Sequence, residues 1–301
     1  MRNTKFMSLE RFGLSCAIAT PFGSTGSIDH ATLTRHARWC LAEGCDGVTL
    51  FGTTGEGFSL SLNERGEVLE AFRQAGFDMR RQVCAGIMAT SVEEAAAQAA
   101  KALSSNVKAL LLAPPFYLKG VGDDGVFAWH SALFDALGDK ARDVILYHLP
   151  YHTGVAITLD LIERLRAAFP SVTCGVKDSA GDWHHTEQLL ARHGDIAILV
   201  GDERHLARAV RQGGQGAISG IANAEAGRLR AMVHEEREEP RISQLVELVL
   251  SLPTLPAIKG LVAHRTSDMG WLDVRPPLVP LTPMQFKILA AQYDGICGGH
   301  G

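Results

Sequence analysis

Residues 144–176 read VILYHLPYHTGVAITLDLIERLRAAFPSVTCGV, and this stretch indicates how the whole chain folds. It begins and ends with short apolar runs, Val144–Tyr147 and Thr173–Val176, which are typical of buried strands. Between them, Thr158–Ala168 has the apolar spacing of an amphipathic helix. A strand, a helix and a second strand in this order predict two parallel strands joined by a right-handed crossover.

The same alternation continues on both sides of this unit. Further strands are expected at Leu14–Thr20, Gly47–Phe51, Gln82–Ile87, Ala109–Leu112, Ala197–Val200 and Gly216–Ser219, and helices at Thr32–Ala42, Leu62–Ala75, Val92–Leu103 and Arg204–Gln212. Ser91, with Glu94 three residues later, predicts a capping box at one helix start. Eight strand–helix units in about 220 residues favour a closed (β/α)8 TIM barrel over an open sheet. No GxGxxG follows the first strand, which argues against a dinucleotide fold.

The pattern changes after Met232. A charged run at residues 234–239 leads into three helical patterns separated by prolines. These patterns lie at Ile242–Leu252, Ile258–His264 and Pro283–Tyr293. We therefore predict a barrel at residues 1–232, which carries the active site, and a small C-terminal helical extension at residues 233–301.

Composition and charge exclude several classes of protein. The 301 residues have a formal net charge of −4, so no basic surface for nucleic acid is expected. The sequence contains no run of 18 apolar residues, so no membrane span is expected. The N-terminal MRNTKFMSLERFG is too polar for a secretory signal. The six cysteines form no CxxC pair and mostly lie in apolar runs, so buried free thiols and a reducing, cytoplasmic location are expected.

Three strand ends carry chemically unusual residues, and barrels of this type hold their active sites at that end. The first is FGTTGE at residues 51–56, which is expected to end the second strand and to open a helix. Backbone N–H groups between its two glycines could bind an anion such as a carboxylate at the helix start. An ordinary glycine-rich turn would have the same composition.

The other two strand ends carry Tyr147 and Lys177. A lysine closing a buried strand would be partly desolvated, which favours the free amine that attacks carbonyl groups. By itself, this lysine could equally well extend to the surface or pair with Asp178. A tyrosine at such a position usually packs in the core, with its own hydroxyl group hydrogen-bonded to a neighbour.

Taken in order, the motifs of this chain resemble those of the dihydrodipicolinate synthase/N-acetylneuraminate lyase superfamily. The likeness rests on ATPF (Ala19–Phe22), GTTGE (Gly52–Glu56), APPFY (Ala113–Tyr117), YxxPxxTG (Tyr147–Gly154), GVKD (Gly175–Asp178), GDE (Gly201–Glu203), GAISGIAN (Gly216–Asn223), LPAIKGLV (Leu255–Val262) and RPPLVPLT (Arg275–Thr282). It covers nearly the whole chain, and the set of motifs is far more specific than any one of them.

The resemblance implies a catalytic role for four residues. Lys177 would form an imine with the ketone of pyruvate or another 2-keto acid, and Tyr147 would be the general acid/base. Thr53 would link Tyr147 to Tyr117 of a neighbouring subunit in a hydroxyl relay. The expected assembly is therefore a homodimer or homotetramer.

The resemblance also implies the binding contacts. The N–H groups of Thr53 and Thr54 would hold the carboxylate of the keto acid, and Ile218 would line the pocket. Gly201 and Glu203, at the seventh strand end, are expected to contact the rest of the substrate. The imine itself acts as the electron sink, so no metal and no organic cofactor are expected.

One position departs from the pattern of authentic dihydrodipicolinate synthases. Those enzymes have an arginine that binds the carboxylate of aspartate semialdehyde, and this chain has His152 at that position. A neutral imidazole cannot bind a carboxylate with two parallel hydrogen bonds, as an arginine does. We therefore favour a class I lyase acting on pyruvate or a 2-keto-3-deoxy acid, by aldol cleavage, condensation or dehydration. 4-Hydroxy-tetrahydrodipicolinate synthase activity is the second possibility, and a catalytically silent keto-acid-binding relative is a third.

A metal-dependent lyase is disfavoured because no convincing set of ligands stands at the strand ends. His184 and His185 are adjacent but lack a carboxylate at ligand spacing. They are expected at the surface, at the start of a helix.

Overall fold

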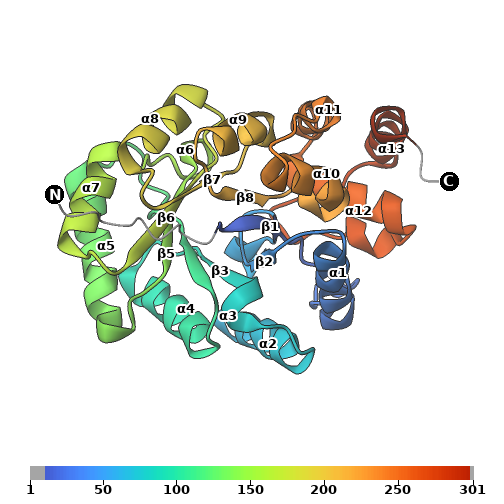
Figure 1. The fold of residues 1–301 in the computed structure, drawn as a ribbon. Coiled ribbons are helices and arrows are strands. Elements are labelled where there is room, and N and C mark those ends of the chain that lie inside the picture. The colour runs from blue at the N-terminus through green and yellow to red at the C-terminus, as the bar shows by residue number, and fades with distance from the viewer. Residues whose placement is uncertain (1–10, 299–301) are drawn as a thin grey trace.

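The computed structural model describes residues 11–298. Within this range, eight parallel strands close into a barrel, in which β1 pairs with both β2 and β8 (Figure 1). The strands are β1 (Gly13–Ala17), β2 (Gly47–Leu50), β3 (Val83–Ile87), β4 (Ala109–Leu112), β5 (Val144–His148), β6 (Thr173–Asp178), β7 (Ala197–Val200) and β8 (Gly216–Ser219). The predicted (β/α)8 barrel is confirmed.

Helices surround the barrel on its outside (Figure 1). The main ones are α1 (His30–Ala42), α2 (Leu62–Gln74), α4 (Val92–Ser104), α5 (Asp123–Leu137), α7 (Leu159–Ala168), α8 (Trp183–His193), α9 (Leu206–Arg211) and α10 (Ala222–His234). Short helical turns also occur at α3 (Met79–Gln82), α6 (Pro150–Thr153), η1 (Gly57–Ser59), η2 (Gly138–Lys140), η3 (Glu203–His205) and η4 (Met269–Leu272). Each helix expected before residue 233 is present, with ends that differ by at most two residues from the sequence pattern.

The predicted capping box at α4 is only half formed. Ser91 caps the helix by accepting from the N–H of Glu94 (3.2 Å). The carboxylate of Glu94, however, accepts from the amide of Gln98 (3.2 Å) instead of from the N–H of Ser91. Gln98 is buried and also bonds the backbone of Met88, so its amide is fixed at a place where the carboxylate of Glu94 reaches it.

Strand register divides the side chains between two faces. Tyr147 of β5 pairs with Lys177 of β6, and His148 pairs with Asp178. Because side chains alternate along a strand, the first pair faces the barrel interior and the second faces the helices. The interior also contains apolar side chains that pack with Tyr147, among them Ala17, Leu111, Ile145, Leu199 and Ile218.

Three helices follow α10: α11 (Pro240–Leu250), α12 (Thr254–Thr266) and α13 (Pro283–Cys297). They lie together beside α10 and α1 (Figure 1). Their apolar residues, such as Leu245, Leu261 and Leu289, are fully buried in the main core. A helical C-terminal segment is thus present, and the boundary at residue 233 remains a prediction.

Within residues 11–298, no helix is both long and apolar enough to cross a membrane. The expectation for the polar N-terminal stretch rests mostly on residues 1–10, which lie outside the described part of the chain. The six cysteines are free thiols, and all but Cys174 are buried.

Candidate active site

Lys177 and Tyr147 are in direct contact at the carboxyl ends of β6 and β5. Nζ of Lys177 donates to Oη of Tyr147 at 3.2 Å and lies 4.4 Å from the centre of the tyrosine ring. Both side chains are about 5% exposed. The lysine therefore neither reaches the surface nor pairs with Asp178, because that carboxylate lies on the other face of β6 and binds residues of α8.

The surroundings of Tyr147 favour its ionised form. Burial by itself raises the pKa of this phenol, but the positive charge of Lys177 lowers it, as do hydrogen bonds with Thr53, Lys177 and Ser179. The net result is a pKa below the ordinary value for tyrosine. A phenol with a lowered pKa next to an amine is suited to moving protons near neutral pH.

The GTTGE turn places Thr53 beside the tyrosine, with Oγ1 3.4 Å from Oη of Tyr147. The N–H groups of Thr53 and Thr54 have no hydrogen-bond acceptor within residues 11–298. The N–H of Glu56, by contrast, donates to the carbonyl of Thr53 (3.0 Å). The prediction that this turn opens an α-helix is wrong. The chain makes only the 3-10 turn η1, and α2 begins at Leu62 after a separate capping box on Ser61.

Two buried contacts that the sequence did not suggest hold this turn in place. Arg65 is 2% exposed and donates to the carbonyls of Gly57 and Gly86 (both 2.7 Å), with its guanidinium over the ring of Phe51. Burial lowers the pKa of Arg65 to about 10. A Cβ at Gly57 would lie 1.9 Å from the carbonyl oxygen of Phe51, so glycine is required for this close approach.

Glu56, the last residue of the motif, is tied to the C-terminal segment. Its carboxylate accepts from Nζ of Lys259 on α12 (2.8 Å) and from the N–H of Arg275 (2.9 Å). Both side chains of the ion pair are fully buried. Glu56 has a positive φ of 52°, a strained conformation that the two bonds stabilise.

Gly201 and Ser179 complete the surroundings of the lysine. A Cβ at position 201 would lie 1.9 Å from Oγ of Ser179 and 3.0 Å from Cε of Lys177. Glycine here leaves the room that both side chains occupy. Ser179 also helps to lower the pKa of the Tyr147 phenol, a role that the sequence analysis missed although the residue follows the GVKD motif directly.

The other predicted substrate-binding residues differ in their burial and in the groups that they contact. Ile218 is fully buried in the barrel interior, in the same cluster as Tyr147. His152 is exposed on α6, but its imidazole is partly shielded from water by the surrounding protein, and this shielding and then the charge of Lys177 lower the pKa of the ring. Glu203 is 5% exposed and accepts from the hydroxyl of Ser219, so its carboxylate is engaged with β8.

Tyr117 is not part of the centre formed by this single chain. Its side chain is 85% exposed, and its backbone has a φ of 89°, which is rare for a residue with a side chain. No hydrogen bond joins it to Thr53 or to any other described residue. An exposed tyrosine on the loop after β4 is what a contribution to a neighbouring subunit would require, and that contribution remains a prediction.

The expectation that His185 is a surface residue without a carboxylate partner is wrong. Its Nδ1 lies 3.1 Å from Oδ2 of Asp178, and its ring stacks on that of His148 at 4.1 Å. Asp178 also accepts from Thr186 (2.8 Å) and from the N–H of Ala180 (3.0 Å), and these bonds lower its carboxyl pKa although burial raises it. Strand alternation could have revealed this cluster, because Asp178 must face α8 if Lys177 faces the interior.

His148, Asp178 and His185 bring three possible metal ligands within 4.8 Å of one another. Nδ1 of His148 accepts the N–H of Ile157 (3.0 Å), which places the proton of the neutral ring on Nε2. A ligand nitrogen must carry no proton, and imidazoles on one ion radiate from it instead of stacking with planes 20° apart. The three residues as they lie here fit a hydrogen-bonded support for β5 and β6 better than a metal site.

The fold and the site together define a (β/α)8 barrel with a lysine–tyrosine centre at the carboxyl ends of its strands, the end at which such barrels carry their active sites. The family model described as the dihydrodipicolinate synthetase family matches residues 11–291. The chain therefore belongs to this family, as its motifs led us to expect.

Two curated relatives and one solved structure show how close the likeness is. An uncharacterized DapA-like lyase of Chloroflexus aurantiacus is 35% identical, over 95% of this chain and 97% of its own length. A 4-hydroxy-tetrahydrodipicolinate synthase of Mycolicibacterium paratuberculosis is 30% identical, over 91% of each chain. The crystal structure of dihydrodipicolinate synthase from Agrobacterium tumefaciens is 49% identical, with a TM-score of 0.93 over 95% of this chain and 99% of that one.

Proposed function

We propose that this protein is a class I lyase that forms an imine between Lys177 and pyruvate or a 2-keto-3-deoxy acid. The observation that carries the proposal is the contact between Nζ of Lys177 and Oη of Tyr147 (3.2 Å), in a buried position at the mouth of the barrel. Membership in the dihydrodipicolinate synthetase family supports the same reaction class.

The proposed chemistry uses only groups of this chain and water. The free amine of Lys177 attacks the ketone carbon, and the carbonyl oxygen leaves as water after it has taken up two protons. Tyr147 delivers and removes protons in this step, with Thr53 as its neighbour in the relay. The iminium then accepts the electron pair that is released when a C–C bond breaks or when a proton leaves C3. The enamine formed in this way takes up a proton at C3 or adds to an aldehyde, which restores the iminium. Addition of water then regenerates the amine and releases the keto acid.

The GTTGE turn is the proposed site for the carboxylate of the keto acid. Two neighbouring N–H groups, those of Thr53 and Thr54, have no acceptor among the described residues. Two adjacent N–H groups without an acceptor in the protein are suited to the oxygens of a carboxylate. The N–H groups of Thr53 and Thr54 follow β2, at the same end of the barrel as Lys177. A carboxylate that they bind would leave the ketone of the keto acid facing Lys177.

The candidate activities differ in their second substrate. His152 stands where dihydrodipicolinate synthases have a carboxylate-binding arginine, which favours a substrate other than aspartate semialdehyde. The likeness to proteins described as 4-hydroxy-tetrahydrodipicolinate synthase or dihydrodipicolinate synthase favours that activity as the second candidate. A silent relative would be expected to have lost the lysine–tyrosine contact.

Borohydride trapping tests the proposal directly. We expect pyruvate with borohydride to inactivate the protein irreversibly and to add a pyruvate-derived mass to the peptide that contains Lys177. Lys177→Ala should show no adduct, while Lys108→Ala, which removes a lysine outside the site, should be labelled like the wild type. An adduct on another lysine, or none at all, contradicts the proposal. Activity that is lost to a chelator would instead indicate a metal-dependent lyase.

The proposal includes an assembly of at least two chains. Tyr117 and its neighbour Leu118 are strongly exposed at the barrel mouth, which fits a contribution to the site of a second copy. A chain that sediments as a monomer, with Tyr117→Phe as active as the wild type, would contradict this part while leaving the imine mechanism intact.

A further inference from the structure

A cavity of about 320 Å³ lies outside the barrel, between α1, α10, α12 and η4. In Figure 1 these helices stand on the side of the barrel opposite to β5 and β6, so the cavity is separate from the lysine–tyrosine centre. Its volume falls at the lower end of the range of sites for small organic molecules. None of its lining residues belongs to the proposed mechanism.

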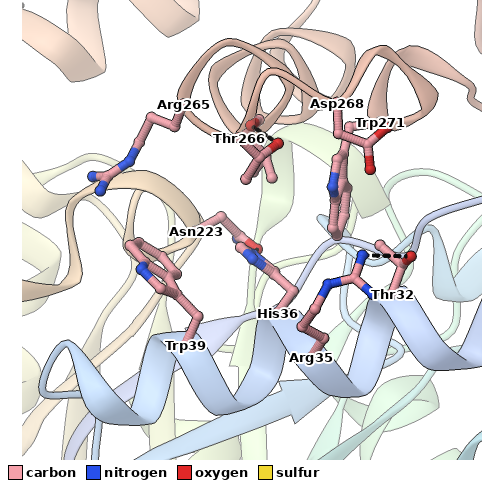
Figure 2. Close-up of a pocket in the computed structure, with 10 residues that line it drawn as sticks. Thr32, Arg35, His36, Trp39, Asn223, Arg265, Thr266, Asp268 and Trp271 are labelled. Carbon is pink, nitrogen blue, oxygen red and sulfur yellow. Dashed lines mark hydrogen bonds between the residues drawn. The ribbon is translucent and has the colours of Figure 1, made fainter. Parts of the chain in front are cut away.

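The walls of the cavity are aromatic. Trp39 and Trp271, two of the four tryptophans of the chain, stand on opposite sides of His36, which forms the floor (Figure 2). The ring of His36 lies parallel to that of Trp39 (5.6 Å, 11°) and meets Trp271 edge-on (4.8 Å). Its Nε2 is bonded to the amide oxygen of Asn223 (3.1 Å), which fixes the ring. A gap between rigid aromatic walls is suited to a flat, apolar group.

Two donors in the lining, the indole N–H of Trp271 and the guanidinium of Arg35, have no carboxylate partner among the described residues. The indole N–H of Trp271 has no hydrogen-bond partner within residues 11–298, and it is not fully buried, so it is open to the cavity. Arg35 donates to the hydroxyl of Thr32 (2.9 Å) but forms no ion pair with any described carboxylate. A donor that is open to a cavity and has no acceptor in the protein can bind an acceptor atom of a ligand.

The charge of the lining is positive. Arg265 lies over the ring of Trp39 at 4.7 Å, but it is paired with Glu225 (3.4 Å). Arg35 is therefore the guanidinium of the lining that has no ion pair within residues 11–298. Asp268 is the single carboxylate in the lining, and it already accepts from the N–H of Gly270 (3.0 Å). A ligand that carries a negative charge therefore fits better than a cation.

We propose that this cavity binds a small aromatic carboxylate. Its ring would lie between Trp39 and Trp271, and its carboxylate would face Arg35 and the N–H of Trp271. This site is independent of the imine mechanism, so its test does not rely on any catalytic activity.

Calorimetric titration with benzoate tests the proposal, with excess pyruvate present so that the keto-acid site is occupied. We expect benzoate to bind, and the neutral benzamide to bind at least about tenfold more weakly, because it lacks the charge that Arg35 would neutralise. Cyclohexanecarboxylate, which has the charge but no flat ring, should also bind several-fold more weakly.

Variants locate the binding. Arg35→Ala, a change at an exposed position, should weaken benzoate binding by about tenfold. Arg38→Ala is the matched control, because it removes the same charge from α1 but its guanidinium bonds the carbonyl of Ala75 outside the cavity. Trp39→Leu, checked for folding by circular dichroism, should weaken binding several-fold. Absence of benzoate binding, equal binding of benzamide, or equal affinities for Arg35→Ala and Arg38→Ala would overturn the proposal.

Discussion

Lys259 and Glu56, which are 203 residues apart in sequence, form an ion pair in which neither side chain is exposed to solvent. The pair joins α12 to the turn that carries Thr53 and Thr54. Lys259 also lies over the ring of Phe22 (4.5 Å), and burial lowers the pKa of its ammonium group although Glu56 opposes that shift. The C-terminal segment is thus attached to the candidate site by a charged contact that excludes water.

Removal of one partner from this pair should destabilise the fold strongly. Lys259→Met leaves the carboxylate of Glu56 buried without its partner, and we expect the free energy of unfolding to fall by about 3–5 kcal/mol. Urea denaturation at neutral pH measures the loss.

The double variant Glu56→Gln/Lys259→Met provides the control. It removes both charges, so it should be more stable than Lys259→Met alone. If the losses of the two single variants simply added in the double variant, the two groups would not be coupled and the ion pair would have no special role.

Tyr147→Phe should separate imine formation from turnover. The amine of Lys177 remains in its buried position, so borohydride should still trap the pyruvate adduct. The phenol that moves protons is lost, and we expect kcat to fall by about 100-fold or more. Steady-state kinetics and trapping on the same preparation make the comparison. Turnover equal to that of the wild type would remove Tyr147 from the mechanism.

The sequence predicted the fold well because burial leaves a local pattern. The strands are nearly all apolar and the helices between them are amphipathic, so β4, β7 and β8 were predicted with the bounds that they have. The motifs within the barrel were also informative, since they lie at the carboxyl ends of its strands. Lys177, Tyr147 and Thr53 could therefore be placed together before any coordinate was known.

The supports of the site could not be predicted in the same way. Arg65 and Lys259 are charged residues on helices, and their sequence neighbours do not indicate that they are buried. Their partners, two backbone carbonyls and the carboxylate of Glu56, come from distant segments. His185 was misassigned because its partner Asp178 is reached across the β6–α8 layer, which only the direction of the strand side chains reveals.

His152→Arg tests whether the α6 loop sets the specificity for the second substrate. An arginine can bind a carboxylate with two parallel hydrogen bonds, which a neutral imidazole cannot. We expect kcat/KM for aspartate semialdehyde, measured with saturating pyruvate, to rise by about tenfold. The neighbouring Tyr151→Arg, at a residue that is 92% exposed, places the same charge outside the site and should have little effect. An unchanged substrate profile in both variants would show that the loop does not select the substrate.

His130 of α5 should make the fold sensitive to acid. The side chain is fully buried, its Nδ1 is bonded to the carbonyl of Val126 (2.8 Å), and its Nε2 has no partner among the described residues. Burial lowers the pKa of this imidazole from 6.5 to about 4. As the pH falls below about 6.5, the unfolded chain therefore takes up the proton before the folded chain does, and the free energy of unfolding decreases until the pH reaches about 4.

The loss that His130 contributes over this interval should be about 3 kcal/mol, because one pKa unit corresponds to 1.36 kcal/mol. His148, whose pKa is also lowered to about 4, adds to the slope in the same direction. His130→Leu should thus make stability less dependent on pH between about 6.5 and 4, measured by urea denaturation at several pH values. His184→Leu, which replaces an exposed histidine, should keep the slope of the wild type. If His130→Leu and the wild type lost stability in parallel as the pH fell, the acid sensitivity would have to come from other groups.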